Sequence, residues 1–253
     1  MTTATAVSPT QREPELAGQT VVVIGGSSGI GLETARRARA EGANVVLTGR
    51  NPERLKQAAA ELGALSSAAF DATDPAALDR FFSDLPERID QVLVTGPGPY
   101  YAPLADLDRE RAHRDLDDHV WLAVAVAQHA VGRVRPGGTL LFMAGTGREQ
   151  GPGLSLMAAS TAALPALIAN LAFEVAPIRV NLIAAGFVDS PLSASLLGND
   201  LDKRRDQLRA TLPIRRVVEP ADIAFLAVHI MTNTALTGAT YDIDGGQQLV
   251  SGA

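Results

Sequence analysis

A run of glycines and serines near the start of the chain has the residue types and spacing of a phosphate-binding turn. The run reads Gly25-Gly26-Ser27-Ser28-Gly29-Ile30-Gly31. Glycines allow a tight turn and a close approach of the backbone to a ligand, and the free amides at the start of a following helix attract a phosphate. The same letters also match G-x-S-x-G, in which Ser27 would be a hydrolase nucleophile. That alternative is disfavoured because this turn follows the first apolar run rather than several strands.

A second chemically suggestive group follows the next apolar run, where Val45-Val46-Leu47-Thr48 leads to Gly49, Arg50 and Asn51. In a dinucleotide-binding fold, an acid at this point binds the free 2′-hydroxyl of the adenosine ribose. Gly49 takes the place of that acid, and the guanidinium of Arg50 suits a 2′-phosphate through its charge and paired hydrogen bonds. These residues predict NADP(H) rather than NAD(H), against the alternative that Arg50 is an ordinary solvated arginine.

The composition excludes several other chemistries. The chain of 253 residues contains no cysteine, so a disulfide framework, a thiol nucleophile and a cysteine-based metal site are excluded. Its 22 Lys and Arg against 28 Asp and Glu give a net charge of −6, which lacks the basic excess of a nucleic-acid-binding protein. The four histidines have no metal-ligand spacing, and no metal is expected.

The elements that must position these residues alternate along the chain. Short apolar runs predict strands at 20–25, 44–48, 68–71, 90–95, 139–144 and 179–184. The intervening segments predict helices at 30–41, 52–62, 75–83, 107–131 and 151–173. This alternation is typical of βαβ units and predicts an α/β, Rossmann-like doubly wound parallel sheet in a single domain. Residues 1–16 are predicted to form a flexible tail and residues 17–253 the folded domain, with an excursion at 190–212.

Neither export nor a membrane span is predicted. The N-terminal residues MTTATAVSPTQREPE have no basic start and no apolar run, unlike a signal peptide. Residues 151–173 carry no charge, but Pro152, Pro165 and Asn170 interrupt them, and a spanning helix would be richer in Leu, Ile and Val. We expect a helix buried between the sheet and a partner subunit, in a cytoplasmic protein.

Five segments in order give the chain a resemblance to the short-chain dehydrogenase/reductase family, from about residue 17 to the C-terminus. They are GGSSGIG at 25–31, Asp71-Ala72, PIRVNLIAAGFVDSP at 177–191, Arg216 with EPADIA at 219–224, and TGATYDIDGG at 237–246. The resemblance implies about seven strands, bound NADP(H), a small-molecule substrate and a homotetramer or homodimer. The cofactor-binding residues that it implies are Gly25, Ser27, Ser28, Gly29, Ile30, Gly31, Arg50, Asn51, Asp71, Ala72, Gly96, Gly186, Val188 and Ser190.

The catalytic positions depart from the pattern of that family. The family's Tyr-x-Ala-Ser-Lys-Ala-Ala aligns with residues 157–163, which puts Met157 at the proton-donating tyrosine and Thr161 at the lysine. The family's serine falls on Ala144 or Gly145. A thioether cannot donate the proton that carbonyl reduction needs, and residues 103–200 contain no Tyr or Lys. The enoyl-reductase variant of the pattern also fails, because its tyrosine would fall on Leu154.

Three residues near the expected pocket are candidates for a relocated proton donor. Tyr100 and Tyr101 follow the fourth predicted strand, at the edge of the sheet where ligands bind in α/β folds, but they could equally line the pocket wall. His119 falls on the family's asparagine and could shuttle protons near neutral pH, or it could be a structural histidine.

Two functions from different classes therefore stay open. The first is an atypical oxidoreductase that moves a hydride between NADP(H) and a small carbonyl or alcohol, with a relocated proton donor. Hydride transfer survives the loss of the donor at reduced rate, because general acid–base assistance contributes about 10²–10⁴-fold. The second is a catalytically silent protein that binds NADP(H) as a sensor or scaffold.

Overall fold

A seven-stranded parallel sheet forms the centre of the protein, in a computed structural model that describes residues 14–147 and 151–250. The strand order is β3-β2-β1-β4-β5-β6-β7. The strands are β1 (Thr20–Ile24), β2 (Asn44–Gly49), β3 (Ser66–Ala69), β4 (Ile89–Val94), β5 (Val134–Gly145), β6 (Arg179–Ala185) and β7 (Thr240–Ile243). The predicted single-domain, Rossmann-like doubly wound sheet is confirmed.

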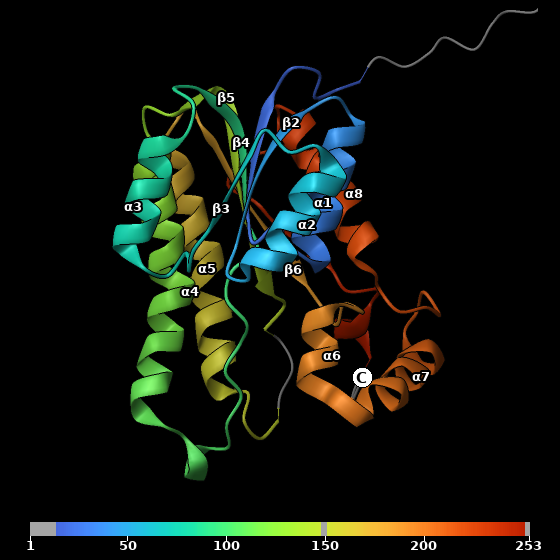
Figure 1. The fold of residues 1–253 in the computed structure, drawn as a ribbon. Coiled ribbons are helices and arrows are strands. Elements are labelled where there is room, and N and C mark those ends of the chain that lie inside the picture. The colour runs from blue at the N-terminus through green and yellow to red at the C-terminus, as the bar shows by residue number, and fades with distance from the viewer. Residues whose placement is uncertain (1–13, 148–150, 251–253) are drawn as a thin grey trace, which may run out of the picture.

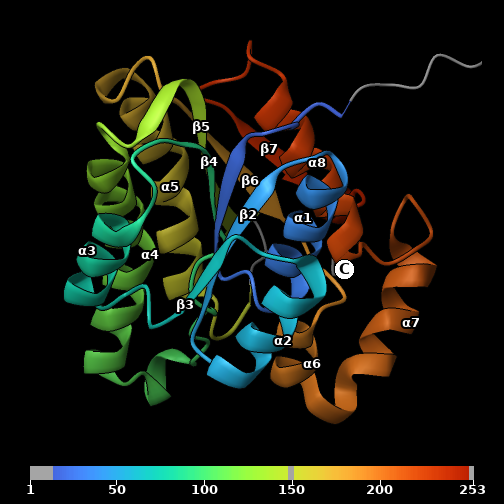
Figure 2. The same cartoon turned by 45° about the horizontal axis from the view of Figure 1, so that its top comes forward.

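Helices cover both faces of the sheet (Figure 1). One face carries α3 (Pro75–Asp84), α4 (Arg109–Ala130) and α5 (Ser155–Glu174). The other carries α1 (Gly29–Ala40), α2 (Pro52–Leu62) and α8 (Pro220–Thr232). The excursion predicted at 190–212 is a pair of helices, α6 (Pro191–Leu197) and α7 (Leu201–Thr211), which projects beyond the sheet (Figure 2).

The central strands are apolar on both faces because each face is covered by helices. Val22 of β1 pairs with Val46 of β2 and with Val92 of β4, and all three side chains lie in the core under α3, α4 and α5. Their neighbours Val21 and Val23 point to the opposite core, under α1, α2 and α8. Successive strand residues thus fill two cores, which fixes the register of the sheet.

Short polar side chains set where several helices begin. Asn51, Asp74 and Asp108 each accept a hydrogen bond from a backbone N–H in the first turn of the helix that follows. Pro52 and Pro75 occupy the first helical position, where the missing N–H costs nothing. Because these caps start α2 and α3 shortly after β2 and β3, the residues between each strand and its helix stay at the carboxyl edge of the sheet.

Several strands and the folded domain begin or end at residues other than those predicted from the sequence. The third strand ends at Ala69, which leaves Asp71 in the loop that follows, and β5 begins at Val134. Leu16 is fully buried and its N–H donates to the carbonyl of Glu41, so residues 14–16 belong to the folded domain rather than to the predicted tail. The rest of that predicted tail, residues 1–13, lies outside the described residues.

Helix α5 contains the uncharged segment noted in the sequence. By length and by a mean hydropathy of 1.7 it could cross a membrane, but it packs against β5 and β6 with Leu164 and Ile168 in the core. Its opposite face is exposed in the single chain and is made mainly of Ala159, Ala162, Ala163, Ala166 and Phe173. The helix therefore covers the sheet on one side only.

Candidate cofactor and active site

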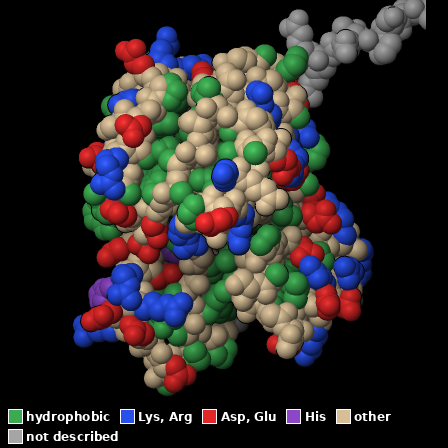
Figure 3. All heavy atoms as spheres, in the orientation of Figure 1, with side chains coloured by type: hydrophobic (Ala, Val, Ile, Leu, Met, Phe, Trp, Pro, Cys, Tyr) green, Lys and Arg blue, Asp and Glu red, His purple; other side chains and the backbone are tan. Residues whose placement is uncertain are grey.

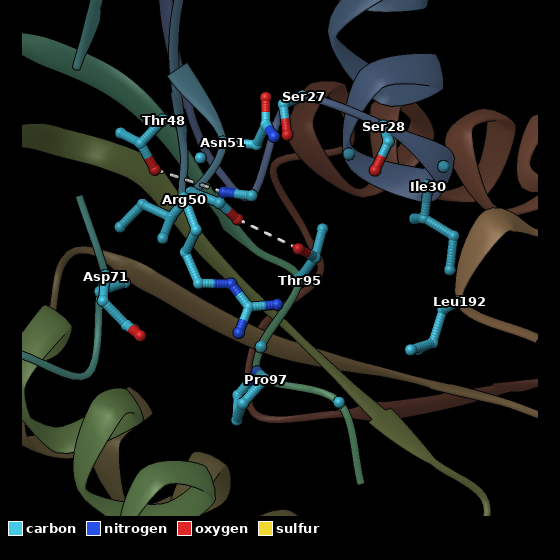
Figure 4. Close-up of a pocket in the computed structure, with 18 of the residues that line it drawn as sticks. Ser27, Ser28, Ile30, Thr48, Arg50, Asn51, Asp71, Thr95, Pro97 and Leu192 are labelled. Carbon is cyan, nitrogen blue, oxygen red and sulfur yellow. Dashed lines mark hydrogen bonds between the residues drawn. The ribbon is translucent and has the colours of Figure 1, made fainter. Parts of the chain in front are cut away.

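A cavity of about 580 Å³ lies at the carboxyl edge of the sheet, where the strand order reverses around β1 and β4 (Figure 4). Ligands of doubly wound folds bind at such a point. All the predicted cofactor-binding residues line this cavity except Gly186 and Val188. The fold thus brings together residues that are up to 165 positions apart, from Gly25 to Ser190 (190 − 25 = 165).

Two positions of the glycine-rich turn, Gly25 and Gly31, leave no room for a side chain. A Cβ on Gly31 would clash with the carbonyl of Gly25, and one on Gly25, which has φ +90°, would clash with the hydroxyl of Thr95. The N–H of Gly26 donates to the carbonyl of Thr48 at 2.8 Å, which fastens the turn to β2. Because the Ser28 side chain does not cap α1, the first amides of that helix face the cavity without a side-chain partner. This arrangement fits a pyrophosphate.

The adenosine end of the cavity carries most of its charge. The Arg50 side chain extends across the cavity, with its guanidinium between Asp71 and Thr95 (Figure 4). Arg54 adds a second guanidinium from the first turn of α2. A Cβ on Gly49 would lie 2.7 Å from the hydroxyl of Ser27, so an acidic side chain does not fit there. A guanidinium at this point can pair with a phosphate through its charge and its parallel N–H groups.

Asp118 of α4 closes the same end of the cavity. Burial raises the pKa of its carboxyl, and the nearby negative charge of Asp71 raises it further, while His119 opposes the shift. Two carboxylates therefore face a cavity that two arginines also enter. Mixed charge of this kind can accept the amino group of an adenine and the phosphate of its ribose separately.

The opposite end of the cavity is built by the segment after β6. Ser190 caps α6 through reciprocal bonds with Ser193, and Ser190, Pro191 and Leu192 line the wall. Asp189 is held by two parallel hydrogen bonds from Arg205 of α7, at 2.7 and 2.8 Å, and hydrogen bonding to Asp189 and Asp202 raises the pKa of Arg205. The pair α6–α7 is thereby fastened to the segment after β6.

Gly186 and Val188 support this wall from behind rather than line it. A Cβ on Gly186 would lie 2.6 Å from the Cβ of Asp244, and Val188 forms a bridge with Val218. Their predicted contact with the cofactor is thus not seen in the lining of the cavity. Close packing of the backbone is the reason that a glycine stands at 186.

Met157, Thr161 and Gly145 lie together, as the resemblance implied. The Thr161 hydroxyl donates to the carbonyl of Met157 at 2.8 Å and lies 3.9 Å from its sulfur. A Cβ on Gly145 would lie 3.7 Å from the Thr161 methyl group and 3.9 Å from the Met157 sulfur. Gly145 and Thr161 also line a second cavity of about 220 Å³. The three positions therefore form one cluster at the end of β5, with a thioether and a hydroxyl as its only side-chain functional groups.

The three candidate proton donors do not line either cavity. Tyr100 is buried, its hydroxyl accepts a hydrogen bond from the N–H of Asp108 at 3.1 Å, and the guanidinium of Arg111 covers its ring. Tyr101 is partly exposed. These contacts make Tyr100 an anchor of the loop after β4.

The His119 side chain is held by Asp115, a residue of the same helix α4. Its Nδ1 lies 2.7 Å from the carbonyl of Asp115 and 3.7 Å from the carboxylate of the same residue. Because a carbonyl only accepts hydrogen bonds, Nδ1 is the nitrogen that donates in this contact. The Asp115 carboxylate also accepts the N–H of Tyr100 at 2.9 Å, which ties the loop after β4 to His119.

Several cavity residues were not predicted from the sequence: Ile24, Thr48, Gly49, Pro52, Arg54, Phe70, Thr73, Thr95, Pro97, Gly98, Asp118, Leu122, Pro191 and Leu192. Most of them adjoin a predicted residue and could have been found by extending each turn by a few positions. Asp118 adjoins the predicted His119 and Leu122 lies three residues after it, but which of these side chains of α4 reaches the cavity is decided by the packing of that helix. Among the described residues, no group of three or more potential metal ligands is found.

The fold and the cavity define a Rossmann-like dinucleotide-binding protein. A family model described as enoyl-(acyl carrier protein) reductase matches residues 24–248. Human dehydrogenase/reductase SDR family member 4 is 30% identical over 254 residues, covering 94% of this chain and 90% of the human protein. The chain therefore belongs to the short-chain dehydrogenase/reductase family of oxidoreductases, which use NAD(P)(H).

Two solved structures are similar over nearly the whole chain. The MalC reductase/Diels-Alderase from Malbranchea aurantiaca is 25% identical with a TM-score of 0.84, covering 94% of this chain and 99% of MalC. BdcA, solved in complex with NADPH, is 26% identical with a TM-score of 0.81, covering 91% of this chain and 95% of BdcA. Both similarities extend beyond the sheet to the helices that border the cavity.

Proposed function

We propose that this protein is an atypical oxidoreductase that moves a hydride between NADP(H) and a small carbonyl or alcohol substrate. The observation that carries the proposal is the cavity itself, in which an uncapped helix start, a glycine-rich turn and Arg50 meet. Bound NADP(H) would supply or accept the hydride. The chain holds the pyrophosphate with its amides and encloses the reacting end with the segment after β6.

NADP(H) is preferred over NAD(H) in this proposal. Gly49 leaves no space for the acid that would bind a free 2′-hydroxyl, and Arg50 enters the cavity from the same turn. Arg54 adds positive charge beside it. The NADPH complex of BdcA supports the assignment by similarity.

The site is atypical because we assign Met157 and Thr161 to the positions of the family's tyrosine and lysine, and Gly145 and His119 to its serine and asparagine. A proton for the substrate must then come from elsewhere. His119 is the stronger candidate, since its Nδ1 is fixed by the Asp115 carbonyl and Nε2 remains to exchange a proton. Tyr101 is the second candidate, while the hydroxyl of Tyr100 is engaged by the backbone.

A catalytically silent NADP(H)-binding sensor or scaffold is the second candidate function. The cluster of Met157, Thr161 and Gly145 favours it, because none of these side chains can protonate a carbonyl oxygen at neutral pH. Either function suits a homodimer or homotetramer in the cytoplasm, with no nucleic-acid or membrane partner. The uncharged outer face of α5 supports the assembly, because a large exposed apolar face is unusual on a monomer.

Fluorescence titration with NADPH and NADH, followed by assays against a panel of ketones, aldehydes and enones, tests both functions. We expect tighter binding of NADPH and slow turnover with at least one substrate. His119→Gln and Tyr101→Phe then identify the donor by which of them abolishes turnover while NADPH binding is kept. Tight NADPH binding without turnover on the whole panel would favour the silent protein, and absent binding would refute both.

A further inference from the structure

Three segments near the reacting end contain no Asp, Glu, Lys, Arg or His. They are residues 96–105 after β4, residues 151–173 including most of α5, and residues 190–199 including α6. The first and the last of these contribute to the lining of the cofactor cavity, and the middle one contributes Thr161, Ala162 and Pro165 to the second cavity. By contrast, the adenosine end carries Arg50, Arg54, Asp71 and Asp118. The charge along the cavity is thus confined to one end.

These three segments touch one another. A Cβ on Gly98 would lie 3.2 Å from the Cδ1 of Leu192, so the loop after β4 packs against α6. A Cβ on Gly153 would lie 3.3 Å from the backbone of Ala102, so the same loop packs against the start of α5. The segments therefore form one continuous uncharged border.

The charge that directly precedes α6 is neutralised. The carboxylate of Asp189 directly precedes Ser190, and the paired hydrogen bonds from Arg205 occupy both of its oxygens. Figure 3 shows the same separation on the surface, where hydrophobic and neutral atoms lie between the charged side chains over α4 and those over α7. The carboxylate that directly precedes the Ser190–Leu192 wall of the cavity is therefore already paired.

Large apolar side chains stand at the border in place of charge. Leu192 lines the cavity and is 49% exposed, and Leu196, one turn further on α6, is 48% exposed. Residues four apart share a helix face, so both leucines face the same side. Tyr101 and Leu104 of the loop after β4 are also exposed apolar side chains.

We propose that the reacting end takes an uncharged, apolar ligand, whose body lies along Leu192 and Leu196 of α6 opposite the loop after β4. Such a ligand gains from removing leucine surface from water, whereas a charged ligand would lose its hydration without finding a partner. The inference rests on the proposed function in that it names the class of the substrate. It concerns binding, however, and is tested without turnover.

The test compares ligands that share one phenylbutanone skeleton, by calorimetry on the NADPH-loaded protein. The apolar probe is 4-phenyl-2-butanone, and the charged probes are its para-carboxylate and para-trimethylammonio derivatives. We expect the apolar ketone to bind at least about tenfold more tightly than both charged probes, because burying an unpaired charge is unfavourable. Equal or tighter binding of a charged probe, or no binding of the apolar ketone below about 10 mM, overturns the inference.

Leu196→Asp is the diagnostic variant because Leu196 does not line the cofactor cavity. We expect it to weaken the apolar ketone about tenfold or more while leaving NADPH affinity unchanged. Leu65→Asp is the matched control, since Leu65 is 56% exposed in the turn before β3. If Leu196→Asp leaves ketone affinity unchanged and instead lowers the oligomeric mass, the leucines belong to an interface between copies and the inference is wrong.

The outcomes separate this inference from the proposed function. Apolar binding without turnover on any substrate overturns the oxidoreductase and leaves the apolar ligand site standing. Turnover of charged substrates with the same efficiency as neutral ones overturns the apolar site and leaves the oxidoreductase standing.

Discussion

The adenosine end and the reacting end of the cavity differ in which features of a dinucleotide-dependent active site they contain. At the adenosine end the geometry and the chemistry of a dinucleotide site are both present, from the glycine turn to Arg50. At the reacting end the geometry is kept, since Met157, Thr161 and Gly145 cluster at the end of β5, but the proton-transferring groups are absent from that cluster.

The difference follows from how each end works. Phosphates are bound by backbone amides and the helix start, which many sequences can supply if glycines allow the approach. Proton transfer depends on the side chain at one position and on its pKa, so a single replacement removes it. Under the proposed function, replacement of the proton donor would therefore leave cofactor binding intact, so the two ends can be tested separately.

The largest expected effect comes from restoring the reacting end. Met157→Tyr with Thr161→Lys puts a phenol and an ammonium one helical turn apart, and the ammonium should lower the phenol pKa. A triple variant adds Gly145→Ser to these two changes. Gly145 has space for the serine, because a Cβ added there would meet its neighbours only at ordinary contact distances. We expect the triple variant to reduce a neutral ketone at least about tenfold faster than the parent, which is less than the full 10²–10⁴-fold contribution of general acid catalysis because the restored groups are not optimally placed.

Steady-state rates with NADPH and 4-phenyl-2-butanone check the gain, with each single variant as a control that gains little. The cost is overpacking at Thr161, where the larger lysine is expected to lower stability by about 1–3 kcal/mol. A folded triple variant that binds NADPH but shows no gain would mean that the pocket is altered beyond its proton donor.

The adenosine end is tested next. Arg50→Ala is expected to weaken NADPH by about 10- to 100-fold and NADH much less, because a charge-assisted contact to the 2′-phosphate is lost. Fluorescence titration of both cofactors measures the two affinities. Arg80→Ala, an exposed arginine on α3, is the matched control. Equal losses for NADPH and NADH would show that Arg50 does not read the 2′-phosphate.

The outer face of α5, behind Met157, predicts a smaller but discrete effect. Light scattering is expected to give two or four times the 26.4 kDa chain mass. Ala166→Arg should lower that mass or raise the dissociation constant of the assembly, because it buries an unpaired charge in an apolar contact. Ala60→Arg on α2 is the control, and a parent protein that is monomeric at micromolar concentration contradicts the prediction.

The smallest effect concerns Asp118 at the adenosine end. Burial and the charge of Asp71 raise the pKa of Asp118 in the folded protein. At a pH above this folded pKa, ionised Asp118 therefore lowers the free energy of unfolding. The loss disappears at a pH below the pKa of Asp118 in the unfolded chain, where the carboxyl is protonated in both states. Asp118→Asn without cofactor should therefore raise Tm by about 1–3 °C at pH 7, with the gain shrinking as pH falls through the acid range. Asp117→Asn, exposed on the same helix, is the control. A gain that grows toward low pH would contradict the assignment.

Much of the fold and the cofactor end could be predicted from local pattern. Apolar runs such as 20–25 had to be buried strands, and the caps Asn51 and Asp74 start helices wherever the chain runs. The glycine turn and Arg50 were found because each motif is contiguous. The third strand was placed two residues late, since its sequence SSAA carries little apolar signal.

The reacting end could not be completed from the sequence in the same way. The cluster of Met157, Thr161 and Gly145 was anticipated by resemblance, but the engagement of the Tyr100 hydroxyl by Asp108 depends on loop packing. Asp118 and Leu122 reach the cavity only through the docking of α4. No periodicity or motif indicates which face of a long helix will meet a ligand at its edge.

The sequence by itself determined the doubly wound sheet and the turn that suits a pyrophosphate, and it predicts that the residues expected to move a proton are replaced. Hydrophobic period and contiguous motifs are local properties, and they specify elements and their order before any packing is known. Only the tertiary structure decided that Gly49 excludes an acid, that Arg205 neutralises Asp189, and that three uncharged segments meet at one border. Those properties depend on distances between residues far apart in the chain, which the packing of helices on the sheet alone sets.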